Sequence, residues 1–417
     1  VRSSDFDKDL TSDPATYVHA DPEANGQPVL KFEQSDQFYH VDAPVVRSLP
    51  DAAHTLFGVS KLSTDGGNPD GLFEIKDSNG NYRRSFGYSN DKTVRVQQYD
   101  ASGSMKSLTH NPSDASTLDG AFQVLSSEVD VDQSTFDLWY NGEQEGETPI
   151  DPMGTGADPI IGYNRGTQRK FHGKLGELIA YDAALNRAQR LIVYNYLSAK
   201  YDVGLDANDL YKGDKSTHGD FDFGVMGIGR DGGSALENLH SGARRKGIAL
   251  TAETVDKGEY VMVGTEAEVP STPVSRLNRT GTDGVDELTA RPDSVHFVTV
   301  TGSPSFSIAF TLTSLGFKTR FRKPDGYELL YADAASCTPD ANDCSWSAAS
   351  ANTAVNGDKV TFANVSSLGE GSYYVTIGTT KPQASPLLNQ RAVTIQGERG
   401  TDGADAGWRH IGAPVEG

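Results

Sequence analysis

Alternating glutamates in one short stretch are the strongest suggestion of acid–base chemistry in this sequence. The segment GEQEGE places Glu143, Glu145 and Glu147 at every second position. Side chains two apart share a face of a β-strand, and a retaining glycosidase needs two carboxylates about 5–5.5 Å apart. Gly142 and Gly146 interrupt this segment, however, and the preceding Asn-Gly pair predicts a turn. We therefore interpret the glutamates as the solvated tip of a hairpin.

Other catalytic motifs are absent from the sequence. The segment GVMGIGRDGG contains Gly224, Gly227 and Gly229, but their spacing does not match the G-x-G-x-x-G loop of dinucleotide-binding proteins. No G-x-S-x-G elbow and no H-E-x-x-H motif occurs, and the nine histidines are scattered. We therefore predict that the chain is not an enzyme. Glycoside hydrolysis is the alternative, and two carboxylates meeting in a groove at catalytic separation would revive it.

The net charge of the chain restricts its partners. The 417 residues carry a formal net charge of -20, and the isoelectric point is about 4.8. A chain this acidic repels phosphate backbones, which argues against nucleic acid as a partner. Two explanations of the acidity stay open: a solubilising surface, and capture of cations by a few Asp-rich loops. No apolar run approaches the ~20 residues that cross a membrane, so we predict no membrane span.

The two cysteines indicate an oxidising environment. Cys337 and Cys344 flank the polar loop of CTPDANDC, and no further metal-ligating residue accompanies them at the spacing of a zinc site. We predict a disulfide between them, with two free thiols as the alternative. A disulfide is typical of extracellular and cell-surface proteins. The start at Val1, without a methionine or an apolar leader, fits a processed export product.

Most of the chain reads as short β-strands separated by polar turns. Segments such as PVLKFEQ, HTLFGVSKL and TVRVQQYD combine β-branched and aromatic residues and end near Gly, Asn, Asp or Pro. The Asn-Gly pair in DSNGNYR is a strong hairpin signal. This spacing of strands and turns is typical of an antiparallel β-sandwich. The sequence therefore predicts an all-β fold.

Residues 176–203, GELIAYDAALNRAQRLIVYNYLSAKYDV, begin as a strand and continue as a helix. Apolar residues on both faces of the strand part predict burial on both sides. Apolar side chains in the second part recur with a period near 3.6. Asp182 or Asn186 can cap the start of the helix, and Gly204 predicts its end. The same period turns Arg190 toward water.

A family resemblance rests on this stretch and on three segments before it. The segment FHGKLGELIAYDAALNRAQRLIVYNYLSAKYDV closely resembles the closing segment of bacterial laminin-G-like domains of the concanavalin A-like superfamily. The segments PVLKFEQSDQFYHVD, TFDLWYNGEQEG and DPIIGYN resemble earlier strands of that family and occur in its order. The resemblance implies a jelly-roll sandwich that the helix closes.

The resemblance divides the chain into four parts. We expect an N-terminal arm at 1–27 and a laminin-G-like, concanavalin A-like sandwich at 28–205. Residues 206–380 are similar to an uncharacterised β-rich module of large secreted bacterial proteins, and we expect a second sandwich there that contains the disulfide hairpin. Residues 381–417 read as a linker or tail, or as the start of a further module.

The resemblance also implies a bound calcium ion, because laminin-G-like sandwiches often hold one at their rim. Carboxylate and amide oxygens of flexible loops suit Ca²⁺. The candidate ligands in STDGGNPDG and DSNGN are Asp65, Asn68, Asp70, Asp77 and Asn79. Further candidates are Asn90, Asp91, Asp130 and Asp132. The alternative is that these residues only form turns.

Together these observations favour a non-enzymatic extracellular role, as an adhesin-like protein of the cell surface or a secreted protein. The laminin-G-like domain would bind a glycan or a surface protein. The competing hypothesis is a self-assembling filament or sheath subunit, whose partners are copies of itself. In that case the arm before Pro28 or the tail after Lys381 would add a strand to the open sheet edge of a neighbour.

Overall fold

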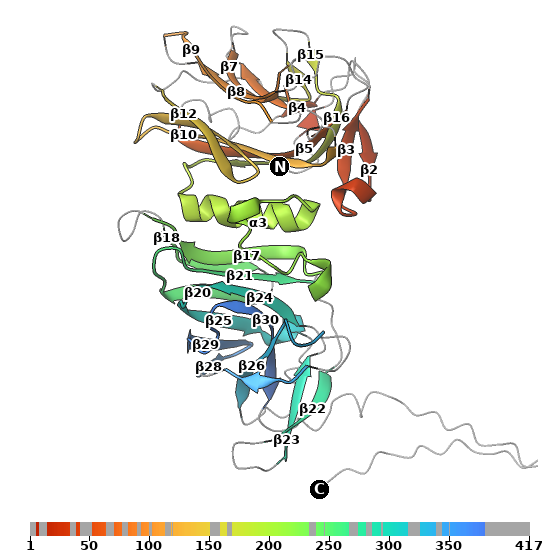
Figure 1. The fold of residues 1–417 in the computed structure, drawn as a ribbon, viewed down its shortest axis with the longest axis vertical. Coiled ribbons are helices and arrows are strands. Elements are labelled where there is room, and N and C mark those ends of the chain that lie inside the picture. Colours follow the sequence, from red (N-terminus) through yellow and green to blue (C-terminus); the bar gives the residue numbers. More distant parts are fainter. Residues whose placement is uncertain are drawn as a thin grey trace, which may run out of the picture.

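Two β-sandwiches lie on opposite sides of one α-helix in the computed structural model of the chain (Figure 1). The structure describes residues 6–7, 15–33, 39–41, 52–63, 71–76, 82–89, 93–99, 102–112, 118, 120–150, 159–164, 169–232, 239–245, 247–266, 274–280, 286–292, 295–315, 326–338, 344–349 and 351–379. Nearly all regular structure in these ranges is antiparallel β, so the predicted all-β fold is confirmed. None of their helices is long and apolar enough to cross a membrane.

The first sandwich consists of two seven-stranded sheets. Sheet A contains, in pairing order, β1 (Phe6–Asp7), β4 (Tyr39–Val41), β13 (Ile160–Ile161), β6 (Phe73–Lys76), β7 (Tyr82–Tyr88), β8 (Val94–Tyr99) and β9 (Met105–His110). Sheet B contains β12 (Glu143–Pro149), β11 (Thr135–Tyr140), β10 (Gln123–Asp130), β5 (His54–Leu62), β16 (Gly173–Tyr181), β3 (Val29–Phe32) and β2 (Thr16–Val18). A small pair, β14 (Tyr163–Asn164) and β15 (Arg169–Lys170), forms sheet C.

The second sandwich consists of a nine-stranded and a five-stranded sheet. Sheet D contains, in pairing order, β18 (Leu239–His240), β17 (Phe223–Arg230), β21 (Tyr260–Thr265), β24 (His296–Thr301), β30 (Gly371–Thr379), β23 (Asp286–Pro292) and β22 (Val274–Thr280), with β26 (Tyr327–Asp333) on β30 and β27 (Ser347–Ala348) on β26. Sheet E contains β19 (Gly242–Arg245), β20 (Ile248–Thr254), β25 (Ser305–Thr311), β29 (Lys359–Val365) and β28 (Asn352–Asn356). Short 3-10 turns are η2 (Pro22–Ala24), η5 (Asp206–Asn208), η6 (Ser216–His218) and η7 (Leu312–Leu315).

Strand β5, in the middle of sheet B, is buried on both faces, and this explains its apolar run at 56–59. Leu56 and Leu62 pack into the core between sheets A and B. Phe57 and Val59 point the other way and pack against the helix. Successive side chains of a strand alternate between faces, so a strand covered on both sides carries apolar residues on both faces. Strand β16 is only half-buried over most of its length, less than its sequence predicted.

The helix α3 (Arg187–Tyr201) fills the layer between the two sandwiches. Asn186 is its N-cap: the Asn186 side chain accepts the N–H of Gln189, and the Gln189 side chain accepts the N–H of Asn186. This reciprocal capping box satisfies two amides that the helix start would otherwise leave open. The helix ends at Tyr201, and its C-cap Asp202 lies in the left-handed region with φ 54°, two residues before the predicted Gly204.

Both faces of α3 are buried, which the sequence did not predict. Leu197 and Tyr201 pack against sheet B. Ile192 and Ala199 pack into a cluster with residues of the second sandwich. A single apolar stripe, as expected from the period, would have left the other face in water. The helix therefore joins the two sandwiches into one packed body.

The residues before Pro28 contribute to the first sandwich. Strand β2 pairs with β3 and forms the edge of sheet B. The Asp21 side chain accepts the N–H of Glu23 at 2.9 Å, and Lys174 of β16 forms an ion pair with Asp21 at 2.6 Å. The described part of the expected arm thus supplies two edge strands, β1 of sheet A and β2 of sheet B, and an anchored turn. Residues 381–417 lie outside the described ranges.

Candidate functional site

The predicted disulfide is present in the structure. Cys337 and Cys344 are bonded directly after strand β26, in the second sandwich. Both side chains pack against the cluster that contains Tyr374 and Phe297. The bond closes the loop of the hairpin that β26 and β27 form.

The predicted calcium ligands are only partly described. Asp65, Asn68, Asp70, Asp77 and Asn79 lie outside the described residues, as do Asn90 and Asp91. Calcium at these loops therefore stays a prediction.

The remaining calcium candidates form a turn between β10 and β11. The Asp130 carboxylate accepts the N–H groups of Asp132 and Gln133 at 2.9 and 3.0 Å. An Asp side chain that binds the backbone two and three residues ahead is typical of a turn residue. Within the described ranges, no three His, Cys, Asp or Glu side chains form a metal-binding group.

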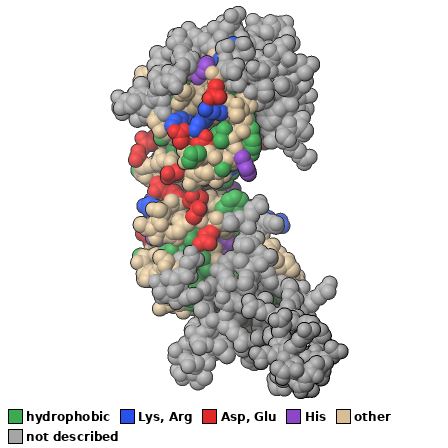
Figure 2. All heavy atoms as spheres, turned by 90° about the vertical axis from the view of Figure 1, so that its right-hand side faces the viewer, with side chains coloured by type: hydrophobic (Ala, Val, Ile, Leu, Met, Phe, Trp, Pro, Cys, Tyr) green, Lys and Arg blue, Asp and Glu red, His purple; other side chains and the backbone are tan. Residues whose placement is uncertain are grey.

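Acidic side chains gather where the two sandwiches meet (Figure 2). A hollow of about 510 Å³ there is lined by Asp202, Asp209, Asp214, Asp220 and Asp222. Burial raises the pKa of Asp214 to about 6 and that of Asp222 to about 7. Asp222 therefore carries only part of its charge near neutral pH, whereas Asp214 is mostly ionised there.

The alternating glutamates occupy a strand and not a hairpin tip. Glu143, Glu145 and Glu147 lie on β12, the edge strand of sheet B, and the turn precedes them at Asn141. Glu145 is half-buried, and its carboxylate lies 2.6 Å from Nδ1 of His110 on β9. Charged side chains are common on edge strands because they discourage pairing with another chain. The motif links the edges of sheets A and B and brings no second carboxylate into a groove.

The pair that looks most like a glycosidase site is Glu128 and Asp137. They face each other across β10 and β11, and the Asp137 carboxylate accepts the N–H of Glu128 at 3.0 Å. Burial, with the charge of Glu128 second, raises the pKa of Asp137 to about 6. A protonated acid beside an ionised carboxylate is how a glycosidase divides its two roles.

Helix α3 covers this pair. Arg190 donates to Glu128 at 2.5 Å, and its guanidinium lies 4.7 Å above the ring of Trp139. Glu128 also accepts the hydroxyl of Thr55 at 2.9 Å and the N–H of Leu185 at 2.8 Å. The carboxylate holds the helix start on sheet B, so no substrate reaches it. The expectation that Arg190 faces water was wrong, because its partner lies 62 residues earlier in the chain.

The outer face of sheet A presents polar side chains in register. Glu74, Ser85, Gln97 and Ser107 are directly paired neighbours across β6, β7, β8 and β9. Their strand neighbours Phe73, Phe86 and Val96 fill the core, so the polar row points away from it. We call these four residues, with the paired residues Arg95 and Thr109, the sheet A face.

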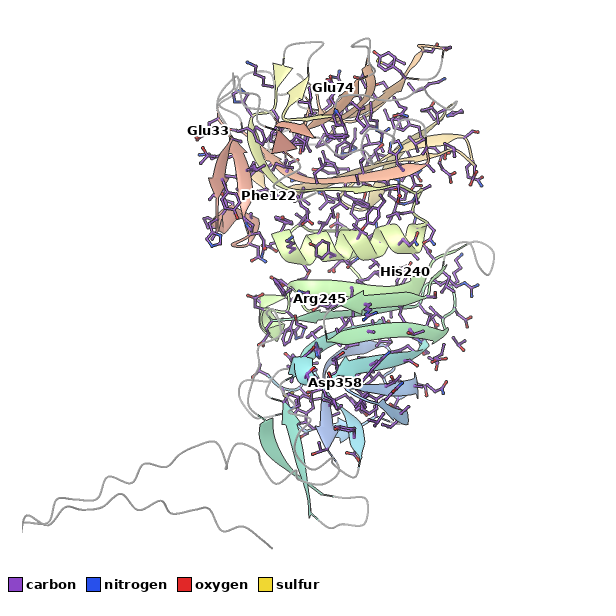
Figure 3. All side chains as sticks on the ribbon, turned by 180° about the vertical axis from the view of Figure 1, so that it is seen from behind. Glu33, Glu74, Phe122, His240, Arg245 and Asp358 are labelled. Carbon is purple, nitrogen blue, oxygen red and sulfur yellow. A yellow bond between two sulfur atoms is a disulfide. The ribbon has the colours of Figure 1, made fainter. Side chains whose placement is uncertain are left out.

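The sheet A face changes from buried to exposed along the row. Glu74 and Ser85 are buried, Arg95 and Gln97 are half-buried, and Ser107 and Thr109 are exposed. The Gln97 amide donates to the sulfur of Met105 at 3.0 Å. Sheet A lies on the side of the sandwich away from α3, and Figure 3 shows Glu74 there. Amides, hydroxyls and a guanidinium together offer both donors and acceptors.

A buried arginine stiffens the sheet beneath this face. Arg84 of β7 is fully buried between the sheets and donates to Gln98 at 3.0 Å and to Ser127 of β10 at 2.9 Å. Its guanidinium lies 4.8 Å from the centre of the Phe136 ring. Burial lowers the pKa of Arg84 to about 9. These contacts connect sheet A to sheet B and fix the strands that carry the polar row.

Sequence reasoning missed the sheet A face. The signal was present in TVRVQQYD, where Arg95 and Gln97 alternate with apolar residues. Which strands pair, and which faces stay open, depends on contacts between distant segments.

Comparison with known proteins supports the fold of the first sandwich. Residues 36–189 match the family model of the concanavalin A-like lectin/glucanases superfamily, which confirms the resemblance for this part of the chain. A search of curated proteins finds no significant match.

Several solved structures are similar at low identity. The carbohydrate-binding module CBM40 of the Ruminococcus gnavus IT-sialidase, bound to α2,3-sialyllactose, is 14% identical with a TM-score of 0.32, covering 44% of this chain and 97% of its own. A heptameric SAP-like pentraxin of Limulus polyphemus is 18% identical with a TM-score of 0.28, covering 34% and 70%. The binding domain of botulinum neurotoxin DC, in complex with rat synaptotagmin II, is 8% identical with a TM-score of 0.34, covering 90% of each chain. Likenesses of this degree carry no argument about function.

Proposed function

We propose that the chain is a non-enzymatic extracellular binding protein whose first sandwich binds a glycan on the sheet A face. This proposal rests on a difference between the outer faces of the two sheets: other elements pack on the outer face of sheet B, whereas the outer face of sheet A includes exposed polar side chains. Helix α3 packs on the outer face of sheet B, and the second sandwich packs on the opposite face of α3. The outer face of sheet A carries a polar row that ends in exposed side chains on β9.

The chemistry of the sheet A face suits sugar hydroxyls. The Arg95 guanidinium donates only, the Gln97 amide donates and accepts, and the hydroxyls of Ser107 and Thr109 do both. A sugar ring presents the same mixture of donors and acceptors. Because the core network around Arg84 holds these strands, little ordering is needed when a ligand binds.

The cover of Glu128 and Asp137 by α3 favours a binding role over hydrolysis. Glu128 and Asp137 lie beneath α3, and Glu128 interacts with Arg190 and the helix start. The family model that matches residues 36–189 includes lectins as well as glucanases. The disulfide supports an extracellular or cell-surface location.

The experiment is a glycan array probed with the full chain, with and without EDTA. Wild type should bind a subset of glycans, and Arg95→Ala and Gln97→Ala should each weaken the best hit about tenfold, the effect of one lost hydrogen bond to a charged or amide group. The matched control is Gln144→Ala on β12, an exposed glutamine of sheet B that should leave binding unchanged. Loss of binding in EDTA would support calcium at the rim loops. Absence of any glycan ligand, or equal binding by all variants, would refute the proposal.

A self-assembling subunit is the second candidate. Strand β2, which lies before Pro28, is a three-residue edge strand. Exchange of such an identical element between copies is a low-cost route to association. Sedimentation of the full chain and of a chain starting at Pro28 distinguishes the candidates. Polymers that disappear on truncation support exchange, and polymers that persist rule it out.

A further inference from the structure

Strand β28 is the end strand of sheet E and lies next to β29 (Figure 1). No described strand pairs with its other side. Its residues Thr353, Ala354, Val355 and Asn356 are all exposed, and 52% of Val355 is accessible. The elements that the structure describes therefore leave the outer side of β28 open.

Strand β28 lacks the features that protect edge strands. Native sheets discourage pairing at an edge with charged side chains, with proline or with very short strands. The sequence of β28, NTAVN, has neither a charge nor a proline over five residues. Every other end strand of sheets A, B, D and E carries a charged residue or has only two or three residues; these strands are β1, β2, β9, β12, β18, β19, β22 and β27. An uncharged edge of this length is prone to pair with a further strand.

The ladder register shows which backbone groups of β28 face outward. The Leu312 N–H donates to the Asp358 carbonyl at 2.8 Å, so the even-numbered residues in this part of β29 bond toward β25. Bonding direction alternates along a strand, so the odd-numbered residues of β29 bond to β28. They lie opposite even-numbered residues of β28. Thr353 and Val355 therefore direct their N–H and C=O groups to the open side.

The open side also has an apolar surface. Val355 is opposite Val360, and Thr353 is opposite Phe362. Val360 and Phe362 are buried in the core of the second sandwich. Directly paired residues share a face of the sheet, so Val355 lies on the core side of β28 and is still half exposed. A further strand would cover Val355 with its own inward side chains.

The tail of the chain contains a segment that matches this edge. Residues 391–396, RAVTIQ, lie outside the described residues. Val393, Thr394 and Ile395 are consecutive β-branched residues, which favour a strand. Val393 and Ile395 are two apart and would share a face of that strand. The segment thus offers two apolar side chains to the side on which Val355 is exposed.

The described chain ends within reach of β28. The Ala349 N–H donates to the Leu329 carbonyl at 2.7 Å, and Leu329 is opposite Ile377 on β30. Strand β28 begins three residues after Ala349, and β30 ends two residues after Ile377. The start of β28 therefore lies within about 30 Å of the end of β30. Residues 380–392 span up to roughly 45 Å when extended, so the same chain can place the segment on β28.

We propose that residues 391–396 dock on the open side of β28 in the same chain and form a sixth strand of sheet E. Main-chain bonds to Thr353 and Val355 would provide the pairing, as in other cases of strand addition. Val393 and Ile395 would cover the exposed part of Val355. A short tether gives a local concentration in the millimolar range, which favours this occupant over a second copy. The docked tail covers the unprotected edge, and its release would open β28 to other chains.

Two substitutions test the tail and the edge separately. Thr394→Pro removes an N–H in the middle of the segment and disfavours pairing there. Val355→Lys places a charge on the open edge, which discourages strand addition. Because Val355 is exposed, this change should leave the core of the second sandwich intact. Val415→Pro, in the same tail beyond the segment, is the matched control.

The measurement is amide hydrogen exchange of the full chain, resolved at Thr353 and Val355. In wild type and Val415→Pro, these two amides should exchange at least about tenfold more slowly than in Thr394→Pro, because docking covers them. Val355→Lys should speed exchange in 392–396 to the same extent. The slow exchange should persist on roughly hundredfold dilution, because the docking is intramolecular.

Three outcomes would overturn the proposal. Equal exchange at Thr353 and Val355 in wild type and Thr394→Pro would mean that the tail does not cover β28. Slow exchange that disappears on dilution would mean that the occupant is a second copy. Fast exchange in Val415→Pro, as in Thr394→Pro, would mean that 391–396 is not the docking segment.

Discussion

Replacing Arg190 with methionine should destabilise the joint between helix α3 and the first sandwich. Arg190 and Glu128 form an ion pair at 2.5 Å with side chains 11% and 8% exposed. The same Arg190 nitrogen donates to the Leu185 carbonyl at 2.6 Å, and the guanidinium lies over Trp139. Methionine keeps much of the apolar stem but removes every one of these interactions.

The size of the effect follows from the burial of the pair. Removing one partner of a buried ion pair costs about 3–5 kcal/mol, because the other charge stays buried without compensation. Glu128 would keep its bonds from Thr55 and from the Leu185 N–H, which places the expected loss at about 3 kcal/mol. Adding Glu128→Gln should recover part of this loss, since the remaining group is then neutral. A double-mutant cycle should give a coupling of about 2 kcal/mol.

Urea unfolding followed by tryptophan fluorescence measures this loss. Trp139 lies directly beneath the guanidinium and reports on the first sandwich. Arg187→Met is the matched control, because Arg187 lies on the same helix with 48% of its side chain exposed and pairs with Asp231 at the surface. Its cost should stay below about 1 kcal/mol. If Arg190→Met costs no more than Arg187→Met, the pair does not hold the helix and the reasoning is wrong.

Three further predictions concern pH and redox state. His296 is buried, and burial lowers its pKa to about 4. The second sandwich should therefore lose roughly 3 kcal/mol of folding stability as pH falls from about 6.5 toward 4. Melting curves recorded at a series of pH values should show this loss for wild type and not for His296→Phe. Asp222 behaves oppositely, because burial raises its pKa from 3.8 to about 7 and the folded chain therefore holds the proton more tightly than the unfolded chain. The stability of the folded chain should fall as pH rises across that range. The same dependence of the melting temperature on pH in Asp222→Asn would contradict this prediction. Reduction of the Cys337–Cys344 bond opens a short loop and should lower the stability of the second sandwich by about 2–3 kcal/mol. Calorimetry with and without reductant measures this loss. An intact mass that shows two free thiols under non-reducing conditions would contradict the bond.

Local patterns predicted the elements of this fold well. The strand periodicity and turn residues of segments such as TVRVQQYD indicated a sandwich, and the 3.6 period after Asp182 indicated α3. The Cys337–Cys344 pair followed from a short polar loop without other metal ligands. Each of these inferences depends on residues within about ten positions of each other, where sequence distance is a fair measure of distance in space.

Contacts between distant segments were the part that sequence could not supply. The period of α3 identifies one buried face, but the second sandwich buries the opposite face. Arg190 looked solvent-facing because nothing near it in sequence reveals Glu128 on β10. The glutamates of β12 looked like a turn because charged residues on an edge strand resemble those of a loop.

The central claim is that the sheet A face binds a glycan, and hydrogen exchange of the full chain with and without the best array ligand tests it most directly. The account predicts slower exchange in 94–99 and 105–110, the strands β8 and β9, with no change in 143–149 of β12. Slower exchange confined to β12 or to the second sandwich would contradict the claim, because the ligand would then occupy a different surface.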